Sequence, residues 1–136
     1  MKQVLLIDDS EIDNYINRLI VAKSEIADVV TVFDSAIDAL EFLADLVAAG
    51  QTFPELIFID LGMPEMDGFQ FLDEYAKFSE EVKEKCSILM LTSSTHPEDI
   101  KRASECKYVE HLFNKPMRPE MLANLSDYLQ PESINK

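Results

Sequence analysis

The chain has 136 residues, 47% of them hydrophobic, which is the size of one domain with enough apolar material for a core. Its 26 acidic and 12 basic residues give a net charge of −14, which argues against binding to nucleic acid because phosphate backbones require clustered cations. No apolar stretch reaches the roughly 20 residues that a membrane span needs, and the short N-terminal apolar run leads into acids, unlike a signal peptide. We therefore expect a cytoplasmic protein with no nucleic-acid or membrane partner.

The organisation of the chain is simple. It contains no internal repeat, low-complexity tract or linker, so we expect one domain over residues 1–130 and a short C-terminal tail over residues 131–136. Cys86 and Cys106 lie far apart, with no CxxC spacing and no neighbouring pair of histidines. We expect them to be free thiols instead of a disulfide or a zinc site.

The first half of the chain alternates short apolar runs with helical patterns. Apolar runs rich in Val, Ile, Leu and Phe are typical of strands buried on both faces, and they predict strands Gln3–Ile7, Val29–Phe33 and Glu55–Ile59. Ser10 is the expected N-cap of the first helix, and Gly50 the expected end of the second. The apolar positions at helical spacing are Ile12, Tyr15, Ile16, Leu19 and Ile20 in the first helix, and Ala36, Leu40, Leu43 and Val47 in the second.

The second half continues the same alternation. Lys77–Cys86 is a charged connection for which the pattern predicts no definite structure. Pro97 suits the first turn of a fourth helix, which has the weakest amphipathic pattern of the chain. The predicted elements are strands Ser87–Leu91 and Val109–Phe113, and helices that begin near Gly68, span Glu98–Lys107 and run from Pro119 to Pro131.

Five strands that alternate with five helices predict a doubly wound α/β sandwich, because parallel strands require right-handed helical crossovers. The flavodoxin-like fold, with a parallel five-stranded sheet in the order 2-1-3-4-5, is the expected arrangement for this count. In such sheets, ligands bind beyond the carboxyl ends of the strands. The residues that follow each predicted strand are therefore the candidates for function.

Chemically reactive residues follow four of the predicted strands. Asp8 and Asp9 follow the first strand, Asp60 the third, Thr92 the fourth, and Lys115 lies just beyond the fifth. Taken singly, an acid could cap a helix, and the hydroxyl and ammonium could be solvated. Together they place three carboxylates, a hydroxyl and an ammonium at one edge of the sheet. That set suits a hard divalent cation and a phosphoryl group accepted by a carboxylate.

In this order, each at the end of the appropriate strand, these residues closely resemble the receiver domain of two-component response regulators, and the resemblance covers essentially the whole chain. It implies that Asp60 accepts the phosphoryl group and that Thr92 and Lys115 bind its oxygens. It also implies a cis bond between Lys115 and Pro116. The implied Mg²⁺ ligands are Asp8, Asp9, Asp60 and the backbone carbonyl of Gly62.

The resemblance further implies a stand-alone response regulator. A sensor histidine kinase or a His-containing phosphotransfer protein would donate the phosphoryl group. The receiver would catalyse only its own phosphotransfer and autodephosphorylation, and would not otherwise be an enzyme. Phosphorylation would then change the surface of the fourth helix, fifth strand and fifth helix, which would bind an unidentified downstream protein.

The chain departs from the family pattern at three positions. Gly62 and Ser94 stand where side chains in relatives influence the lifetime of the acyl phosphate. Leu112 stands where many receivers carry a switch aromatic, and Phe113 should face the opposite side of the sheet by strand alternation. We expect His96, in the loop after Thr92, to be exposed to solvent.

Three other functions are weighed against this one. A haloacid-dehalogenase-type phosphohydrolase would need a second acid at the position of Gly62 as its proton donor. A dinucleotide-binding fold would need glycines after the first strand, and the chain has three glycines in total with none there. A receiver-fold binding module that acts without phosphorylation is the main alternative, although such modules usually lose part of the acidic and lysine set.

Overall fold

The computed structural model describes residues 1, 3–94 and 96–129. The predicted end of the last helix at Pro131 and the predicted tail over residues 131–136 lie outside these residues. The domain boundary at residue 130 therefore stays a prediction.

A parallel five-stranded sheet forms the centre of the molecule, in the order β2-β1-β3-β4-β5. The predicted flavodoxin-like, doubly wound α/β fold is thus confirmed. Predicted and observed strand ends differ by at most one residue, and β3 ends on Asp60 itself. The strands are β1 (Gln3–Ile7), β2 (Val29–Phe33), β3 (Leu56–Asp60), β4 (Ser87–Thr92) and β5 (Val109–Asn114).

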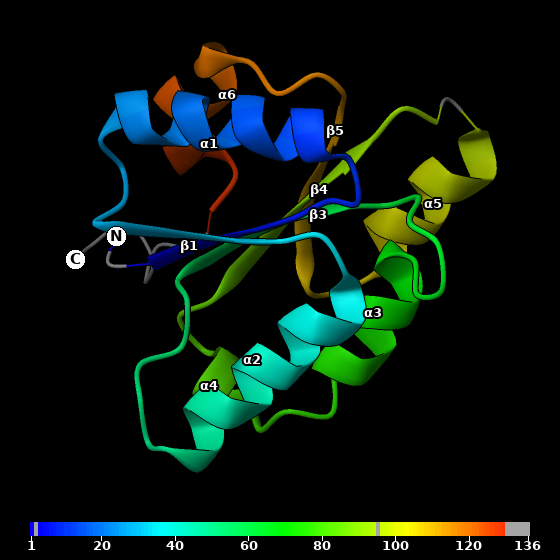
Figure 1. Ribbon diagram of the computed structural model, residues 1–136. Coiled ribbons are helices and arrows are strands. Elements are labelled where there is room, and N and C mark those ends of the chain that lie inside the picture. Colours follow the sequence, from blue (N-terminus) through cyan, green and yellow to red (C-terminus); the bar gives the residue numbers. More distant parts are fainter. Residues whose placement is uncertain (2, 95, 130–136) are drawn as a thin grey trace.

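Helices cover both faces of the sheet: α1 and α6 lie on one face, and α2, α3 and α5 lie on the other (Figure 1). The α-helices of the described residues are α1 (Glu11–Ser24), α2 (Ala36–Ala48), α3 (Gly68–Tyr75), α4 (Glu80–Lys83), α5 (Pro97–Glu105) and α6 (Pro119–Ala123). Within the described residues, no helix combines the length and the apolar composition needed to cross a membrane.

One segment that the sequence left open forms a helix, and one helical prediction needs correction. The connection between α3 and β4, for which the pattern predicts no definite structure, contains the short helix α4, whose N-cap is the Ser79 hydroxyl. The last predicted helix is shorter than expected, because α6 stops at Ala123 and a 3-10 turn follows over Leu125–Asp127. Ser10 caps α1 as predicted, and its hydroxyl accepts the backbone N–H of Asp13 at 3.2 Å.

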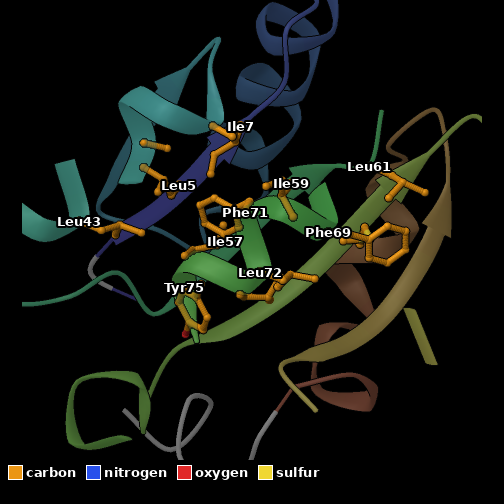
Figure 2. Packing of buried hydrophobic residues seen from close by; sticks show 14 of the residues in the cluster. Leu5, Ile7, Leu43, Ile57, Ile59, Leu61, Phe69, Phe71, Leu72 and Tyr75 are labelled. Carbon is orange, nitrogen blue, oxygen red and sulfur yellow. The ribbon is translucent and has the colours of Figure 1, made fainter. Parts of the chain in front are cut away.

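The apolar core has two halves, because successive strand residues point to opposite faces of the sheet. Leu5 and Ile57 belong to the half that packs under α2 and α3, which Figure 2 shows with Phe71 and Tyr75. The other half lies beneath α1 and α6. Its members include Val4, Leu6, Leu56, Phe58, Leu89, Leu91 and Phe113.

Helix α1 presents its apolar residues to solvent, contrary to what its periodicity suggests. Ile12 is 71% exposed and Tyr15 66% exposed, and Ile16 and Leu19 are also exposed. We call these four side chains the α1 face. The buried positions are instead Asn14, Asn17 and Val21. Asn14 is drawn inward because its side-chain amide donates a hydrogen bond to the backbone carbonyl of Asp8 at 2.6 Å.

Smaller errors of the same kind occur in the next two helices. In α2, Leu46 is buried while Val47 is exposed. In α3, helical spacing predicts Phe69, Leu72 and Ala76 on the buried face. Phe69 and Leu72 are buried, but Phe71 and Tyr75 also fill the core and Ala76 lies at the exposed helix end. The periodic pattern therefore located these helices correctly but misplaced the edge of each buried face.

Lys83 is the least expected residue of the interior. Its side chain is only 3% exposed, although it comes from the charged connection between α3 and β4. The ammonium donates hydrogen bonds to the backbone carbonyl of Ala76 and to the Tyr108 hydroxyl, each at 2.9 Å, and pairs with Glu80 at 3.3 Å. It therefore joins α3, α4 and the start of β5, at the sheet edge opposite to the strand ends that carry Asp60 and Thr92.

Candidate functional site

Three carboxylates meet at the carboxyl ends of β1 and β3. Asp8 directly follows β1, Asp60 ends β3, and these strands are parallel neighbours. Asp8, Asp9 and Asp60 each offer a carboxylate oxygen within 4.8 Å of the other two. Asp8 and Asp60 are buried and Asp9 is exposed. The three acids predicted from the sequence are therefore brought together.

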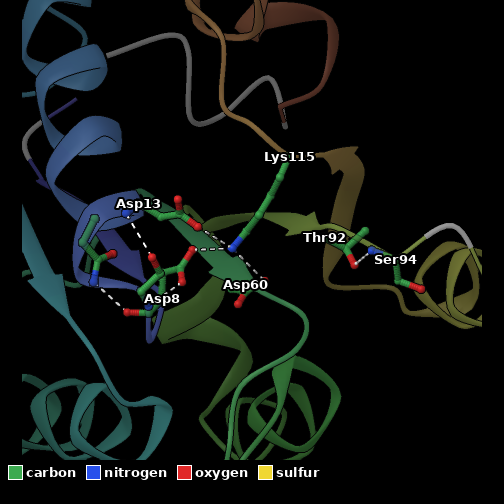
Figure 3. Close-up of polar contacts among 8 residues, drawn as sticks. Asp8, Asp13, Asp60, Thr92, Ser94 and Lys115 are labelled. Carbon is green, nitrogen blue, oxygen red and sulfur yellow. Dashed lines mark hydrogen bonds and ion pairs between the residues drawn. The ribbon is translucent and has the colours of Figure 1, made fainter.

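Lys115 provides the positive charge of the site. Its ammonium donates hydrogen bonds to Asp8 at 2.8 Å and to Asp13 at 3.0 Å, and lies 3.3 Å from Asp60 (Figure 3). The Lys115–Pro116 peptide bond is cis, as the resemblance implied. Asp13 is the one residue of this network that the sequence reasoning missed. Its position four residues after Asp9, in the first turn of α1, is the signal that could have identified it.

Burial and charge perturb both partners of the Lys115–Asp60 pair. Removal from water and the nearby charge of Asp8 raise the pKa of Asp60 to about 6, while Lys115 and the backbone N–H of Gly62 oppose that rise. Partial burial lowers the pKa of Lys115, but its hydrogen bonds to Asp8 and Asp13 and the charge of Asp60 outweigh this, so the pKa is raised above its usual value. At neutral pH the site therefore holds an ammonium among several carboxylates.

Thr92 lies on the neighbouring strand, but its hydroxyl serves its own loop. The hydroxyl oxygen accepts the backbone N–H of Ser94 at 2.9 Å (Figure 3). The Ser94 hydroxyl donates to the Asp99 carboxylate at 2.9 Å and accepts the backbone N–H of His96 at 3.1 Å. Thr92 is thus placed at the predicted sheet edge, while its hydrogen bonding ties the loop to the start of α5.

The departures from the family pattern also have structural consequences. A Cβ added at Gly62 would meet nothing within 4 Å, so this flank of Asp60 is open. Leu112 packs beside the core half under α2 and α3, while Phe113 belongs to the other half, as strand alternation predicted. His96 is exposed, also as predicted. No aromatic ring therefore occupies the usual switch position.

Comparison with known proteins identifies the family of the chain. Residues 4–126 match the family model described as the response regulator receiver domain. The chain belongs to this family. It is 28% identical over 129 residues to the chemotaxis protein CheY of Halobacterium salinarum, a match that covers 94% of this chain and 97% of that protein.

Solved structures agree with this assignment. A two-component response regulator from Cytophaga hutchinsonii superimposes with a TM-score of 0.86 at 29% identity, over 100% of this chain and 98% of that one. The Mn²⁺-bound form of the response regulator Rcp1 has the same fold, with a TM-score of 0.75 at 22% identity over 94% of each chain. The molecule is thus a CheY-like receiver domain of a two-component system, with an acidic cluster that can hold a metal ion.

Proposed function

We propose that this receiver works as a phosphorylation-controlled switch in the cytoplasm. A sensor histidine kinase or a His-containing phosphotransfer protein donates a phosphoryl group to Asp60 in the presence of Mg²⁺. The modified domain then binds a downstream protein. The observation that carries this proposal is the convergence of Lys115 and the acidic cluster on the one carboxylate that ends β3.

The proposed reaction is a direct phosphoryl transfer. A carboxylate oxygen of Asp60 forms a bond to phosphorus as the bond between phosphorus and the donor imidazole nitrogen breaks, and the electron pair stays on that nitrogen. Phosphoryl transfer depends chiefly on positioning and charge neutralisation. The ammonium of Lys115 lies 3.3 Å from Asp60 and would bind an oxygen of the incoming group. Water attack on the resulting acyl phosphate would return Asp60 and release inorganic phosphate.

The acidic cluster has the chemistry that Mg²⁺ prefers, namely carboxylate oxygens together with retained waters. Asp8, Asp9 and Asp60 would supply these oxygens, and the backbone carbonyl of Gly62 is a proposed fourth ligand. A bound cation supplies charge neutralisation to the phosphoryl group and to the acids. Rcp1, which shares this fold, has been solved with Mn²⁺, and that supports a divalent metal here.

Thr92 and the face around α5 would carry the signal outward. The Thr92 hydroxyl oxygen accepts the Ser94 N–H, which leaves its own O–H available, and once Asp60 is phosphorylated this O–H would donate a hydrogen bond to the phosphoryl group. The β4–α5 loop would move with it. Between α5 and β5 lies a cavity of about 350 Å³ lined by Ile100, His111 and Leu112 among others, and we propose this α5–β5–α6 face for the downstream protein.

A different surface suits the phosphoryl donor. The α1 face exposes Ile12 and Tyr15 one turn or less from Asp13, which contacts Lys115. A cavity of about 270 Å³ between α1 and the chain after β5 is lined by Ile16, Lys115 and neighbouring residues. A partner helix docked here would stand beside Asp60, so we propose that the histidine-bearing donor binds the α1 face.

The first experiment is intact-mass spectrometry after incubation with acetyl phosphate, with and without Mg²⁺, on the wild type and Asp60→Asn. We expect a single phosphoryl adduct that requires both Mg²⁺ and Asp60. Asp9→Ala should need more Mg²⁺ for the same yield, because one carboxylate of the cluster is lost. Absence of any adduct, together with no binding of beryllofluoride, would favour the binding module that acts without phosphorylation.

The donor surface needs its own test. Tyr15→Ser should slow phosphorylation by a histidine phosphotransfer protein that modifies the wild type, and should leave the reaction with acetyl phosphate unchanged. Val47→Ser is the matched control, since Val47 is an exposed apolar residue of α2 on the opposite face. Equal slowing by both variants would argue against the α1 face as the docking surface.

A further inference from the structure

Asp13 is an acidic residue next to the site that has no place in the metal cluster. It lies in the first turn of α1, where its backbone N–H donates to the Ser10 cap at 3.2 Å. Its carboxylate accepts a hydrogen bond from Lys115 at 3.0 Å. Its side chain is 39% exposed, compared with 3% for Asp8 and 7% for Asp60. Asp13 therefore contacts the Lys115 ammonium from the exposed side of the site, whereas Asp8 and Asp60 contact it from the buried side.

The three carboxylates compete for a limited number of donors. A lysine ammonium has three N–H groups and no acceptor. Asp8, Asp13 and Asp60 all lie within 3.3 Å of this ammonium. A phosphoryl group on Asp60 would add oxygens that need the same donors. Any N–H group of Lys115 that stays hydrogen-bonded to Asp13 is unavailable to the phosphoryl oxygens.

The contact with Asp13 is not needed to bring Lys115 to the site. The ammonium also reaches Asp8 at 2.8 Å and Asp60 at 3.3 Å, and both of those acids are buried at the strand ends. The backbone of Lys115 is fixed independently, because its N–H donates to the carbonyl of Thr92 at 2.8 Å. Removing the Asp13 carboxylate would thus leave the Lys115 ammonium near Asp60. The N–H group that had bonded to Asp13 would become available.

We propose that Asp13 is a positioning residue that tethers the Lys115 ammonium toward α1 and so weakens its hold on the phosphoryl group at Asp60. The proposal rests on the function proposed above for Asp60. The tether favours the unmodified state, because the ion pair with Asp13 is at full strength only while no phosphoryl oxygen competes for Lys115. Its negative charge also opposes the approach of an anionic group.

The test measures the affinity of the wild type and Asp13→Asn for beryllofluoride, an analogue of the phosphoryl group, at saturating Mg²⁺. Bound fluoride is followed by fluorine NMR. We expect Asp13→Asn to bind roughly two- to five-fold more tightly, the size of effect that a partly exposed ion pair gives. Asp13→Glu keeps the charge and a reach to Lys115, and should return the affinity toward that of the wild type.

Glu11→Gln is the matched control, because Glu11 is an exposed acid in the same turn of α1. It removes one negative charge without touching the Lys115 network. Tighter binding by Asp13→Asn alone supports the tether. Equal tightening in Asp13→Asn and Glu11→Gln would assign the effect to general charge and overturn the proposal, as would unchanged or weaker binding in Asp13→Asn.

The outcomes also separate this inference from the proposed function. If the wild type binds beryllofluoride and the Asp13 variants match it, only the tether is wrong. If the wild type fails to bind beryllofluoride, the phosphoacceptor role of Asp60 fails, and the tether fails with it. Circular dichroism and urea unfolding of each variant verify that a change in affinity does not come from partial unfolding.

Discussion

The site has two halves at one sheet edge that are held in different ways. In the acidic half, ion pairs to Lys115 join Asp8, Asp13 and Asp60 across two strands and a helix. In the hydroxyl half, short-range hydrogen bonds close the β4–α5 loop on itself. The acidic half is therefore assembled before any phosphoryl group arrives, whereas the Thr92 hydroxyl contacts only its own loop and, under the proposed function, would reach the phosphoryl group after Asp60 is modified. Binding of the phosphoryl group and the response to it would then depend on separate interactions.

The largest expected effect comes from breaking the acidic half at its cation. Lys115→Ala leaves buried carboxylates without a counter-charge, and should lower the free energy of unfolding by about 3–5 kcal/mol in metal-free buffer. Mg²⁺ should restore much of the loss because it neutralises the same acids. Urea unfolding measures both. As a control, Lys101→Ala removes an exposed lysine and should lower the free energy of unfolding by about 0.5 kcal/mol or less. Similar losses in Lys115→Ala and Lys101→Ala would show that the acidic half does not depend on Lys115 for its stability.

The charge of Asp60 should itself destabilise the metal-free protein. Its pKa is about 6 in the folded state against 3.8 in its ordinary environment, so between these pH values the folded state binds more protons than the unfolded state. Stability then falls as pH rises from about 4 to about 6, by at most about 3 kcal/mol.

Asp60→Asn removes this titration, so the variant should not show the fall and should exceed the wild type in stability above pH 6. Urea unfolding across pH 4–7.5 with a chelator present measures the difference. Parallel pH profiles for the two proteins would show that the carboxylate of Asp60 carries no such strain. Addition of Mg²⁺ should reduce the advantage of the variant, because the cation compensates the charge of the wild type.

Two glycines after Asp60, Gly62 in the loop and Gly68 at the start of α3, sharpen the contrast between open and packed parts of the acidic half. A Cβ at Gly68 would lie 3.0 Å from the backbone of Leu61 and 3.1 Å from the carbonyl of Asp60, while one at Gly62 meets nothing. Gly68→Ala should therefore destabilise by about 2 kcal/mol, and Gly62→Ala by no more than about 0.5 kcal/mol. Thermal unfolding of both variants measures this difference in stability. Equal losses of stability would mean that the backbone around Gly68 shifts to accommodate the added Cβ.

The smallest effect should come from the hydroxyl half. Ser94→Ala removes the bonds to Asp99 and to the backbone of His96, and should cost about 1 kcal/mol because these bonds are partly exposed. Faster hydrogen exchange at the start of α5 is the specific readout. Ser93→Ala, at the exposed neighbouring serine, is the control. Unchanged exchange in Ser94→Ala would show that this serine does not restrain the loop.

Local signals were sufficient for the fold and for most of the site. Short runs of Val, Ile, Leu and Phe predicted every strand within one residue. In β1, β3 and β4 the physical reason is that a central parallel strand must be apolar on both faces, whereas the edge strands β2 and β5 are only partly buried. Asp8, Asp60 and Lys115 were found together because the ends of parallel strands meet at one sheet edge. The combination of these residues, in order and each at the end of its own strand, made the site predictable, whereas no single residue would have been sufficient.

The missed features depend on tertiary partners that no local pattern encodes. Asp13 acquires its role only because Lys115, about a hundred residues later, reaches it. Lys83 is buried only because Ala76 and Tyr108 supply acceptors for its ammonium. Asn14 turns inward because the carbonyl of Asp8 needs a donor there, and this rotates α1 relative to the face that hydrophobic counting selects.

The two cysteines differ in reactivity, and one of them offers a natural attachment site for a reporter label. Neither forms a disulfide. Cys86 is buried, and removal from water raises the pKa of its thiol to about 12, so its reactive thiolate is scarce at neutral pH. Cys106 is only half-buried and caps the end of α5. A single dye or spin label should therefore attach at Cys106 in the unmodified sequence. Because the chain has no tryptophan, that label would report movement of α5 without competing intrinsic indole fluorescence.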